Sequence, residues 1–238
     1  MAAGNAPLGL ASLVLLAGSI VMIFFVILAG VKDTAPLNKT YFLQADTSGI
    51  SGARAVSQWT YFYVCGPDNT DCSKAYAAMP FRTPWADDAS GVPDGLNSNY
   101  YYLMWRFGWV FYLIALFFDV CAFFAGFLAC CGRLGAALSG LIALTALVFY
   151  SVAVSLMTAT FVKARNAFKD NGHDAKIGTY AFGFSWGAWG CIFIAVILFF
   201  IGVRGNHDGG RRGWRRRRSV RSHASYDVGG RRVKDDYS

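Results

Sequence analysis

Residues 37–66 read LNKTYFLQADTSGISGARAVSQWTYFYVCG and lie between two long apolar stretches of the chain. This segment is too polar to enter a bilayer, and it belongs to a connection that is long enough to carry structure of its own. It contains one of the two cysteines of that connection. These features predict a small external domain, clipped by a disulfide, between two membrane spans.

Long uncharged stretches on either side predict four transmembrane helices. The chain has 55% hydrophobic and 15% charged residues, which is too apolar for an ordinary soluble domain. Residues 8–31 carry no charge, and Asp119 is the one charge within residues 107–131, 134–162 and 177–203. A helix needs about 20 apolar residues to cross about 30 Å of hydrocarbon, so each stretch is long enough. The first stretch could be a signal peptide, but its apolar run is too long for one and no basic residue precedes it.

The distribution of lysine and arginine predicts that both termini are cytoplasmic. The segment after Val203 holds 11 basic residues, whereas residues 33–102 hold four basic residues against seven Asp. Basic residues accumulate on the cytoplasmic side of a membrane. Lys163, Arg165, Lys169 and Lys176 lie between the third and fourth spans and favour the opposite orientation, but the tail outweighs them.

The expected fold class is all-α transmembrane, a four-helix bundle with a small β-containing, disulfide-clipped extracellular domain. We expect the second outer loop to continue the third helix. The order of segments is a cytoplasmic N-terminus (1–7), a first helix (8–31), an outer loop domain (32–102), a second helix (103–131), a third helix (134–162), a second outer loop (163–176), a fourth helix (177–203) and a basic, disordered cytoplasmic tail (204–238).

Residues 56–65 of the outer loop alternate, which indicates a β-strand. Trp59, Tyr61, Tyr63 and Cys65 would share one face of this strand. Residues 46–49 and 66–69 are clusters of turn-forming residues that would bound it or lead out of it.

Two covalent modifications are candidates in the outer loop. Cys65 and Cys72 are its two cysteines, and such a pair in an oxidising space predicts a disulfide. The chain-entropy model gives it a stabilising effect of about 2.5 kcal/mol. Asn38-Lys39-Thr40 is the sole N-glycosylation sequon. Its closeness to the end of the first span weighs against efficient modification, so its occupancy stays open.

The run from Leu37 to Gly66, with the following Cys72 and Pro80-Phe81, resembles the Sur-seven/PalI family of fungal plasma-membrane tetraspan proteins. Its place after the first of four spans fits that family. The motif positions that this resemblance marks are Asp46, Gly49, Arg54, Trp59 and Gly66.

A tryptophan followed by two cysteines is also similar to the outer-loop signature of claudins. Here the spacing from Trp59 to Cys65 is short, and the Gly-Leu-Trp element is missing. The Sur-seven/PalI resemblance implies residence in the stable plasma-membrane domains called eisosomes. It also implies roles in membrane organisation, cell-wall integrity and endocytosis.

Asp119 is the sharpest candidate inside the membrane. A carboxylate at mid-span costs about 2.5 to 3.5 kcal/mol on insertion scales, so such residues usually face a partner or water. Counting from the Gly132-Arg133 hairpin places Thr145 at a similar depth, and Ser19 lies near the middle of the first helix. We favour a protonated or hydrogen-bonded Asp119 that locks helices together over an ion or proton path.

The basic tail predicts contact with anionic lipid at the inner leaflet. Each basic residue near such a surface contributes about 1 kcal/mol, and clusters of this size are typical of phosphatidylserine or phosphoinositide sites. Phosphorylation of Ser219, Ser222 or Ser225 would add negative charge and weaken the attachment. A plain topology anchor and an arginine-type sorting signal are the alternatives, and four spans argue against nucleic-acid binding. The cluster consists of Arg211, Arg212, Arg215, Arg216, Arg217 and Arg218.

No enzyme is indicated, and no cofactor is expected. The three histidines are scattered, and the sequence has no phosphate loop and no nucleophile elbow. We expect a structural protein of the plasma membrane, in which Trp59 and its neighbouring tyrosines contact the cell wall or another copy of the chain. The tail would bind inner-leaflet lipid or an eisosome scaffold protein. The alternatives are a channel or transporter subunit that uses Asp119 and a sensor-accessory protein like those of the PalI branch.

Overall fold

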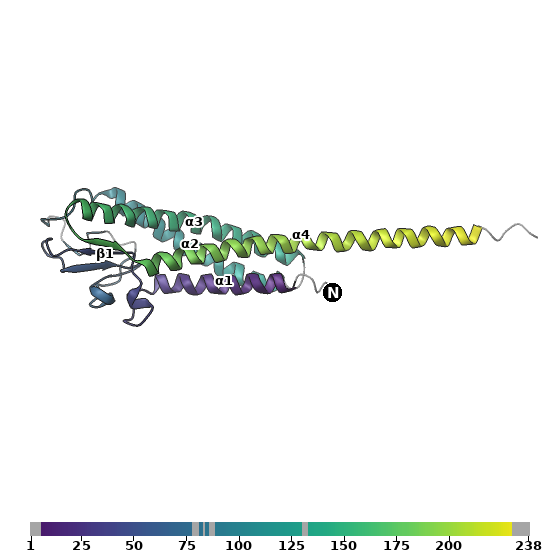
Figure 1. Ribbon diagram of the computed structural model, residues 1–238, viewed down its shortest axis with the longest axis horizontal. Helices are drawn as coiled ribbons and strands as arrows, with labels where there is room; N and C mark the ends of the chain where they lie inside the picture. The colour runs from purple at the N-terminus through teal and green to yellow at the C-terminus, as the bar shows by residue number, and fades with distance from the viewer. Residues whose placement is uncertain (1–5, 78–80, 83, 86–88, 130–132, 230–238) are drawn as a thin grey trace, which may run out of the picture.

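The computed structural model describes the backbone of residues 6–77, 81–82, 84–85, 89–129 and 133–229. It describes side chains over the same ranges except at residues 6, 129, 133 and 205–229. The helices lie side by side in an elongated bundle, and a small β-sheet lies at one end of it (Figure 1). Helix α4 extends far beyond the other end.

Four helices are long and apolar enough to cross a membrane, which confirms the predicted spans by length and composition. Large apolar side chains such as Phe117 and Phe124 are each 64% exposed on the outside of the bundle, as lipid-facing residues are. The helices are α1 (Ala6–Ile27), α2 (Asn99–Ala129), α3 (Arg133–Asp170) and α4 (Thr179–Gly229).

Two of the helices are longer than their spans. Helix α3 runs to Asp170, so the second outer loop begins as a continuation of the third helix, as expected. Helix α4 continues to Gly229, and the backbone of residues 204–229 is helical where we expected a disordered tail. Arg215 to Arg218 are good helix formers, whereas Gly205, Gly209, Gly210 and Gly213 before them are poor ones, so the sequence alone did not predict this helix.

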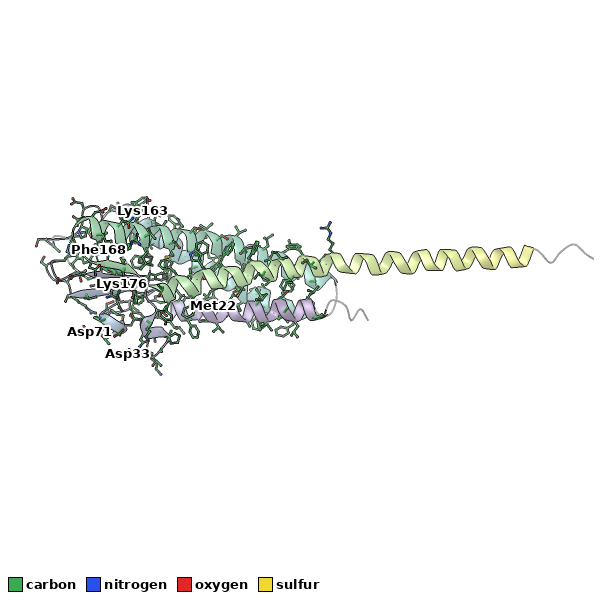
Figure 2. All side chains as sticks on the ribbon, in the orientation of Figure 1. Met22, Asp33, Asp71, Lys163, Phe168 and Lys176 are labelled. Atoms are coloured by element: carbon green, nitrogen blue, oxygen red, sulfur yellow. A yellow bond between two sulfur atoms is a disulfide. The ribbon has the colours of Figure 1, made fainter. Side chains whose placement is uncertain are left out.

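Small residues allow the helices to approach closely. The most extensive packing is between α2 and α3, and α4 packs on both α1 and α3. Ala122 is fully buried, and a Cβ on Gly126 would lie 2.6 Å from Leu13 Cδ2. A Cβ on Gly187 would lie 3.2 Å from Met22 Sδ, which is within the bundle (Figure 2). Close van der Waals contact of this kind is what holds helices together in lipid.

The outer sheet has four antiparallel strands in the order β3-β2-β1-β4. Leu43 of the central strand β1 pairs with Trp59 on one side and with Ile177 on the other. The strands are β1 (Leu43–Asp46), β2 (Val56–Trp59), β3 (Val64–Cys65) and β4 (Ala175–Ile177).

The structure corrects the predicted strand over residues 56–65. That segment forms two strands, β2 and β3, joined by a turn in which the backbone N–H of Thr60 donates to the carbonyl of Tyr63 at 2.9 Å. The Thr60 hydroxyl accepts a hydrogen bond from the backbone N–H of Tyr63 at 3.1 Å. A threonine that bonds its local backbone favours a turn over a strand, and the alternating pattern did not reveal it.

The second outer loop supplies a strand that we did not predict. Strand β4 follows α3 and pairs along β1, so the two outer loops share one sheet. Lys176, on this strand, and Phe168, near the end of α3, both lie at the sheet end of the molecule (Figure 2). A strand of three residues is too short to show a periodic pattern.

Trp59 lies at the centre of an aromatic core between the sheet and the bundle. Its ring centroid is 5.8 Å from that of Phe81, 6.2 Å from Trp85 and 5.7 Å from Phe168. Trp59 and Tyr61 are both fully buried. Trp59 and Tyr61 therefore belong to this core and offer no surface to an external partner. Because residues 60–63 form a turn, these side chains do not share one face of a single strand, and Tyr63 is half-buried.

The junction between β4 and α4 generates a stability prediction. A Cβ on Gly178 would lie 1.7 Å from the backbone oxygen of Tyr41, which cannot move without shifting the chain that leads into β1. We expect Gly178→Ala to lower the free energy of unfolding by about 3 kcal/mol, measured as thermal unfolding of the detergent-solubilised protein.

Gly183→Ala is the matched control for this substitution. Gly183 lies in the first turns of α4, just after this junction, and a Cβ there would have nothing within 4 Å. We expect the control to change the stability by less than about 1 kcal/mol. Equal melting temperatures for Gly178→Ala and the unmodified protein would contradict the close packing of β4 against the first outer loop.

Candidate functional site

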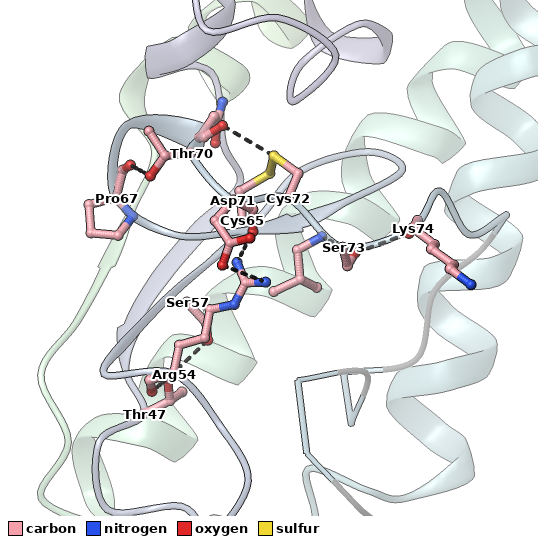
Figure 3. A network of polar contacts seen from close by, with 12 residues as sticks. Thr47, Arg54, Ser57, Cys65, Pro67, Thr70, Asp71, Cys72, Ser73 and Lys74 are labelled. Atoms are coloured by element: carbon pink, nitrogen blue, oxygen red, sulfur yellow. Dashed lines mark hydrogen bonds and ion pairs between the residues drawn. A yellow bond between two sulfur atoms is a disulfide. The ribbon is translucent and has the colours of Figure 1, made fainter.

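A disulfide between Cys65 and Cys72 closes a short loop at the edge of the outer sheet, as predicted. The loop contains the 3-10 helix η2 (Pro67–Asn69), where the Thr70 hydroxyl donates to the carbonyl of Pro67 at 2.7 Å (Figure 3). Asp68, Asn69 and Asp71 have φ values of 55°, 58° and 45°. Aspartate and asparagine tolerate this left-handed conformation better than other residues with side chains, which explains the composition of the loop.

Arg54 connects this loop to the turn between β1 and β2. Its guanidinium lies 3.4 Å from the Asp71 carboxylate and also donates to the backbone oxygen of Asp71 (Figure 3). The Thr47 hydroxyl donates to the carbonyl of Arg54 at 2.6 Å. Because the Asp71 side chain is 87% exposed, the ion pair contributes little energy, and it positions the two segments.

Asp46 and Gly49 shape the same turn. The Asp46 carboxylate accepts a hydrogen bond from the backbone N–H of Ser48 at 2.9 Å, and this bond lowers the pKa of that carboxyl. Gly49 lies against Gly91, since a Cβ on Gly91 would come within 2.3 Å of the Gly49 backbone oxygen. Gly91 has a φ of 83°, which also favours glycine.

The cystine loop is also tied to the membrane end of the first outer loop. The side-chain amide of Asn69 donates to the carbonyls of Leu37 and Thr40 at 2.7 and 3.2 Å. The motif positions Asp46, Gly49 and Arg54 therefore contact neighbouring loop residues and hold the segments of the outer domain together. Asn38 lies in this region, in the 3-10 helix η1 (Leu37–Lys39), and its side chain is half-buried.

Asp119 lies inside the bundle and is fully buried. Its Oδ2 accepts a hydrogen bond from the Ser19 hydroxyl at 2.7 Å, which links α2 to α1. Its Oδ1 is buried and has no hydrogen-bond partner among the described residues. Thr145 does not meet Asp119, because its hydroxyl is exposed on α3 and donates to the carbonyl of Leu141 at 3.0 Å.

A chain of hydroxyl groups joins α2, α3 and α4. Tyr150 of α3 donates to the Tyr112 hydroxyl of α2 at 3.0 Å, and Tyr112 lies 3.1 Å from the Ser185 hydroxyl of α4. Ser185 donates to the carbonyl of Ala181 at 2.8 Å, so Tyr112 is the donor to Ser185. This network was not predicted from the sequence, although tyrosines in the middle of apolar stretches were a usable signal.

Within the described residues, no group of three or more His, Cys, Asp or Glu is placed to hold a metal ion. The side chains of the basic tail, from Arg211 to Arg218, and those of Ser219, Ser222 and Ser225 lie outside the described part of the chain. Two sets of polar residues therefore remain as candidate sites. One is the motif of the outer loop, and the other consists of the buried polar groups of the helix bundle.

Comparison with known proteins gives a family match and several relatives. The SUR7/PalI family model matches residues 8–198. Protein SUR7 of Candida albicans is 38% identical over 202 residues, which is 82% of this chain and 74% of that protein.

Two further relatives come from Saccharomyces cerevisiae. SUR7 family protein FMP45 is 35% identical over 72% of this chain and 58% of its own length. The plasma membrane protein YNL194C is 34% identical over 74% of this chain and 61% of its own length. The chain thus spans less than two thirds of these two relatives.

The family match extends from the first span into the fourth and includes the cystine-clipped outer sheet. The fold is a claudin-like bundle of four membrane-spanning helices with an outer domain. The chain therefore belongs to the SUR7/PalI family of membrane proteins.

Proposed function

We propose that this protein is a structural, non-enzymatic component of stable plasma-membrane domains of the eisosome type. The observation that carries this proposal is the family match over residues 8–198, together with a relative named as a plasma membrane protein. In this role the protein supports membrane organisation, cell-wall integrity and endocytosis. Both termini are cytoplasmic, and the sheet faces outward.

The continuous helix α4 supports a role at the inner leaflet. Its membrane-spanning part ends near Arg204, and the helix runs on to Gly229 through the six clustered arginines. Anionic lipids, including phosphoinositides, are the expected partners, because each basic residue near such a surface adds about 1 kcal/mol. Eisosome scaffold proteins and other copies of this chain are further expected partners, and nucleic acid is not.

The outer domain supports an organising role because it is packed against the bundle. Phe42 of the sheet domain stacks on Phe161 of α3 with centroids 4.9 Å apart, and Tyr61 donates to the carbonyl of Trp109 in α2 at 2.8 Å. A contact made with the cell wall would thus be transmitted to the membrane helices. Attachment on both sides of the bilayer would slow lateral diffusion.

The test is recovery after photobleaching of the tagged full-length protein in a fungal cell, imaged beside an eisosome scaffold marker. We expect static patches that coincide with the marker. Replacement of Arg211, Arg212 and Arg215 to Arg218 by glutamine should speed the recovery, because it removes the attraction to anionic lipid. Replacement of the same residues by lysine keeps the charge and should leave the patches static. Diffuse, rapidly recovering fluorescence of the unmodified protein would contradict the proposal.

A channel or transporter subunit is the second candidate, and the partly unpaired Asp119 is the observation that favours it. We expect instead that Asp119 links α1 to α2, because Ser19 bonds it directly. Asp119→Asn keeps an acceptor for Ser19 and should preserve folding, whereas Asp119→Leu should lower the stability by about 1 kcal/mol. Proton flux into reconstituted vesicles should be at background for the unmodified protein and for both Asp119 variants. A flux above background that Asp119→Asn abolishes would establish the channel instead.

A further inference from the structure

A cavity of about 340 Å³ opens on the outer domain at the start of α2. Its volume is within the usual range of small-ligand sites. None of Asp46, Gly49, Arg54, Trp59 and Gly66 lines it, and its described lining includes Phe81, Leu96, Asn97, Ser98, Asn99 and Tyr102.

The hydrogen-bonding groups of the cavity have defined orientations. The indole N–H of Trp85 donates to Asn97 Oδ1 at 3.3 Å, which fixes the side-chain amide and leaves its two N–H donors for a ligand. The guanidinium of Arg106 donates to the Tyr102 hydroxyl, so that hydroxyl keeps its own hydrogen to donate. Asn97, Ser98 and Asn99 are exposed at the rim.

Apolar groups complete the lining. Phe81 and Leu96 are almost fully buried, and Phe81 is held against Trp105 of α2 with centroids 4.9 Å apart. A rigid apolar wall beside amide and hydroxyl groups suits a ligand that has a C–H face and a rim of hydroxyl groups. A sugar ring has this chemistry.

The lining disfavours other ligands. It contains no carboxylate and no histidine for a metal ion or for acid–base chemistry among the described residues. The cation among its described lining residues, Arg82, already interacts with another group of the protein, so the described lining is not built around an unpaired charge. An uncharged, hydroxyl-rich ligand fits this composition best.

We propose that this cavity binds a hexose ring of a neutral polysaccharide outside the membrane. The proposal rests on the proposed structural function. Glycan binding in the cavity provides the outer attachment that the buried Trp59 cannot provide. Binding is measured on purified protein and does not depend on patches. Static patches without glycan binding would refute the cavity assignment alone, and glycan binding by a freely diffusing protein would refute the proposed function alone.

The experiment is saturation-transfer NMR on the full-length protein in lipid nanodiscs, titrated with laminarihexaose or chitohexaose. We expect saturation transfer to the sugar protons of at least one of the two glycans. Asn97→Ala and Tyr102→Phe should each weaken binding by roughly three- to tenfold, as the loss of one hydrogen bond does.

Asn171→Ala is the matched control. Asn171 is an exposed asparagine of the same outer domain, and its amide donates to the carbonyl of Ala167 at 2.9 Å. Asn171→Ala should leave the affinity for the glycan within about twofold of that of the unmodified protein. Unchanged melting temperatures would show that the cavity variants are folded. Absence of transfer to both glycans, equal affinities of the folded cavity variants and the control, or binding of inositol phosphate in place of both glycans would each overturn the assignment.

Discussion

The burial of Trp59 where the outer sheet meets α3 joins the two halves of the molecule. Apolar contacts between helices gain little in lipid, because the acyl chains are as apolar as the side chains. The outer domain lies in water, where burial of a tryptophan and its aromatic neighbours is strongly favourable. Phe81 extends this core from Trp59 to Trp105 and Phe161, in α2 and α3. The hydrophobic effect outside the membrane therefore holds together helices that it cannot hold inside.

Inside the membrane, a few polar groups add specificity to this packing. The pair of Ser19 and Asp119 connects α1 to α2. The hydroxyls of Tyr150, Tyr112 and Ser185 connect α3, α2 and α4, and each donates to the next. A polar group in hydrocarbon needs a partner, so each of these bonds disfavours other arrangements of the helices. With a stiff bundle and a folded outer domain, attachment at either face would restrain the whole protein.

Much of the fold could be predicted from the sequence because its signals are local. The four spans follow from runs of apolar residues, and the cystine follows from two cysteines in one outer loop.

Strand β4 could not be found in this way, because three residues pair with a segment about 130 positions earlier and their pattern carries no periodicity. We placed Ser19 near the middle of the first span and Thr145 at a depth similar to that of Asp119. Ser19 bonds Asp119, whereas the Thr145 hydroxyl bonds its own helix, since depth alone does not fix which side of a helix a residue occupies. The burial of Trp59 could not be predicted, because an alternating pattern does not say whether a strand face is covered, and the turn at residues 60–63 interrupts the strand. The cavity at the start of α2 has no recognisable sequence motif, because its residues come together only when the outer loop packs on the helix.

Hydrogen–deuterium exchange of the full-length protein in nanodiscs is the most direct test of the claim that both outer loops and the bundle form one body. The backbone N–H of Asp46 donates to Asp174 at 2.8 Å, and that of Gly178 donates to Phe42 at 3.1 Å. Both bonds cross between the loops, and both amides should exchange at least about 100-fold more slowly than unprotected amides. The amide of Phe42, which donates to Trp59 within the first loop at 2.8 Å, is the internal reference. Protection of Phe42 with free exchange at Asp46 and Gly178 would show that the second loop moves independently and would contradict the claim.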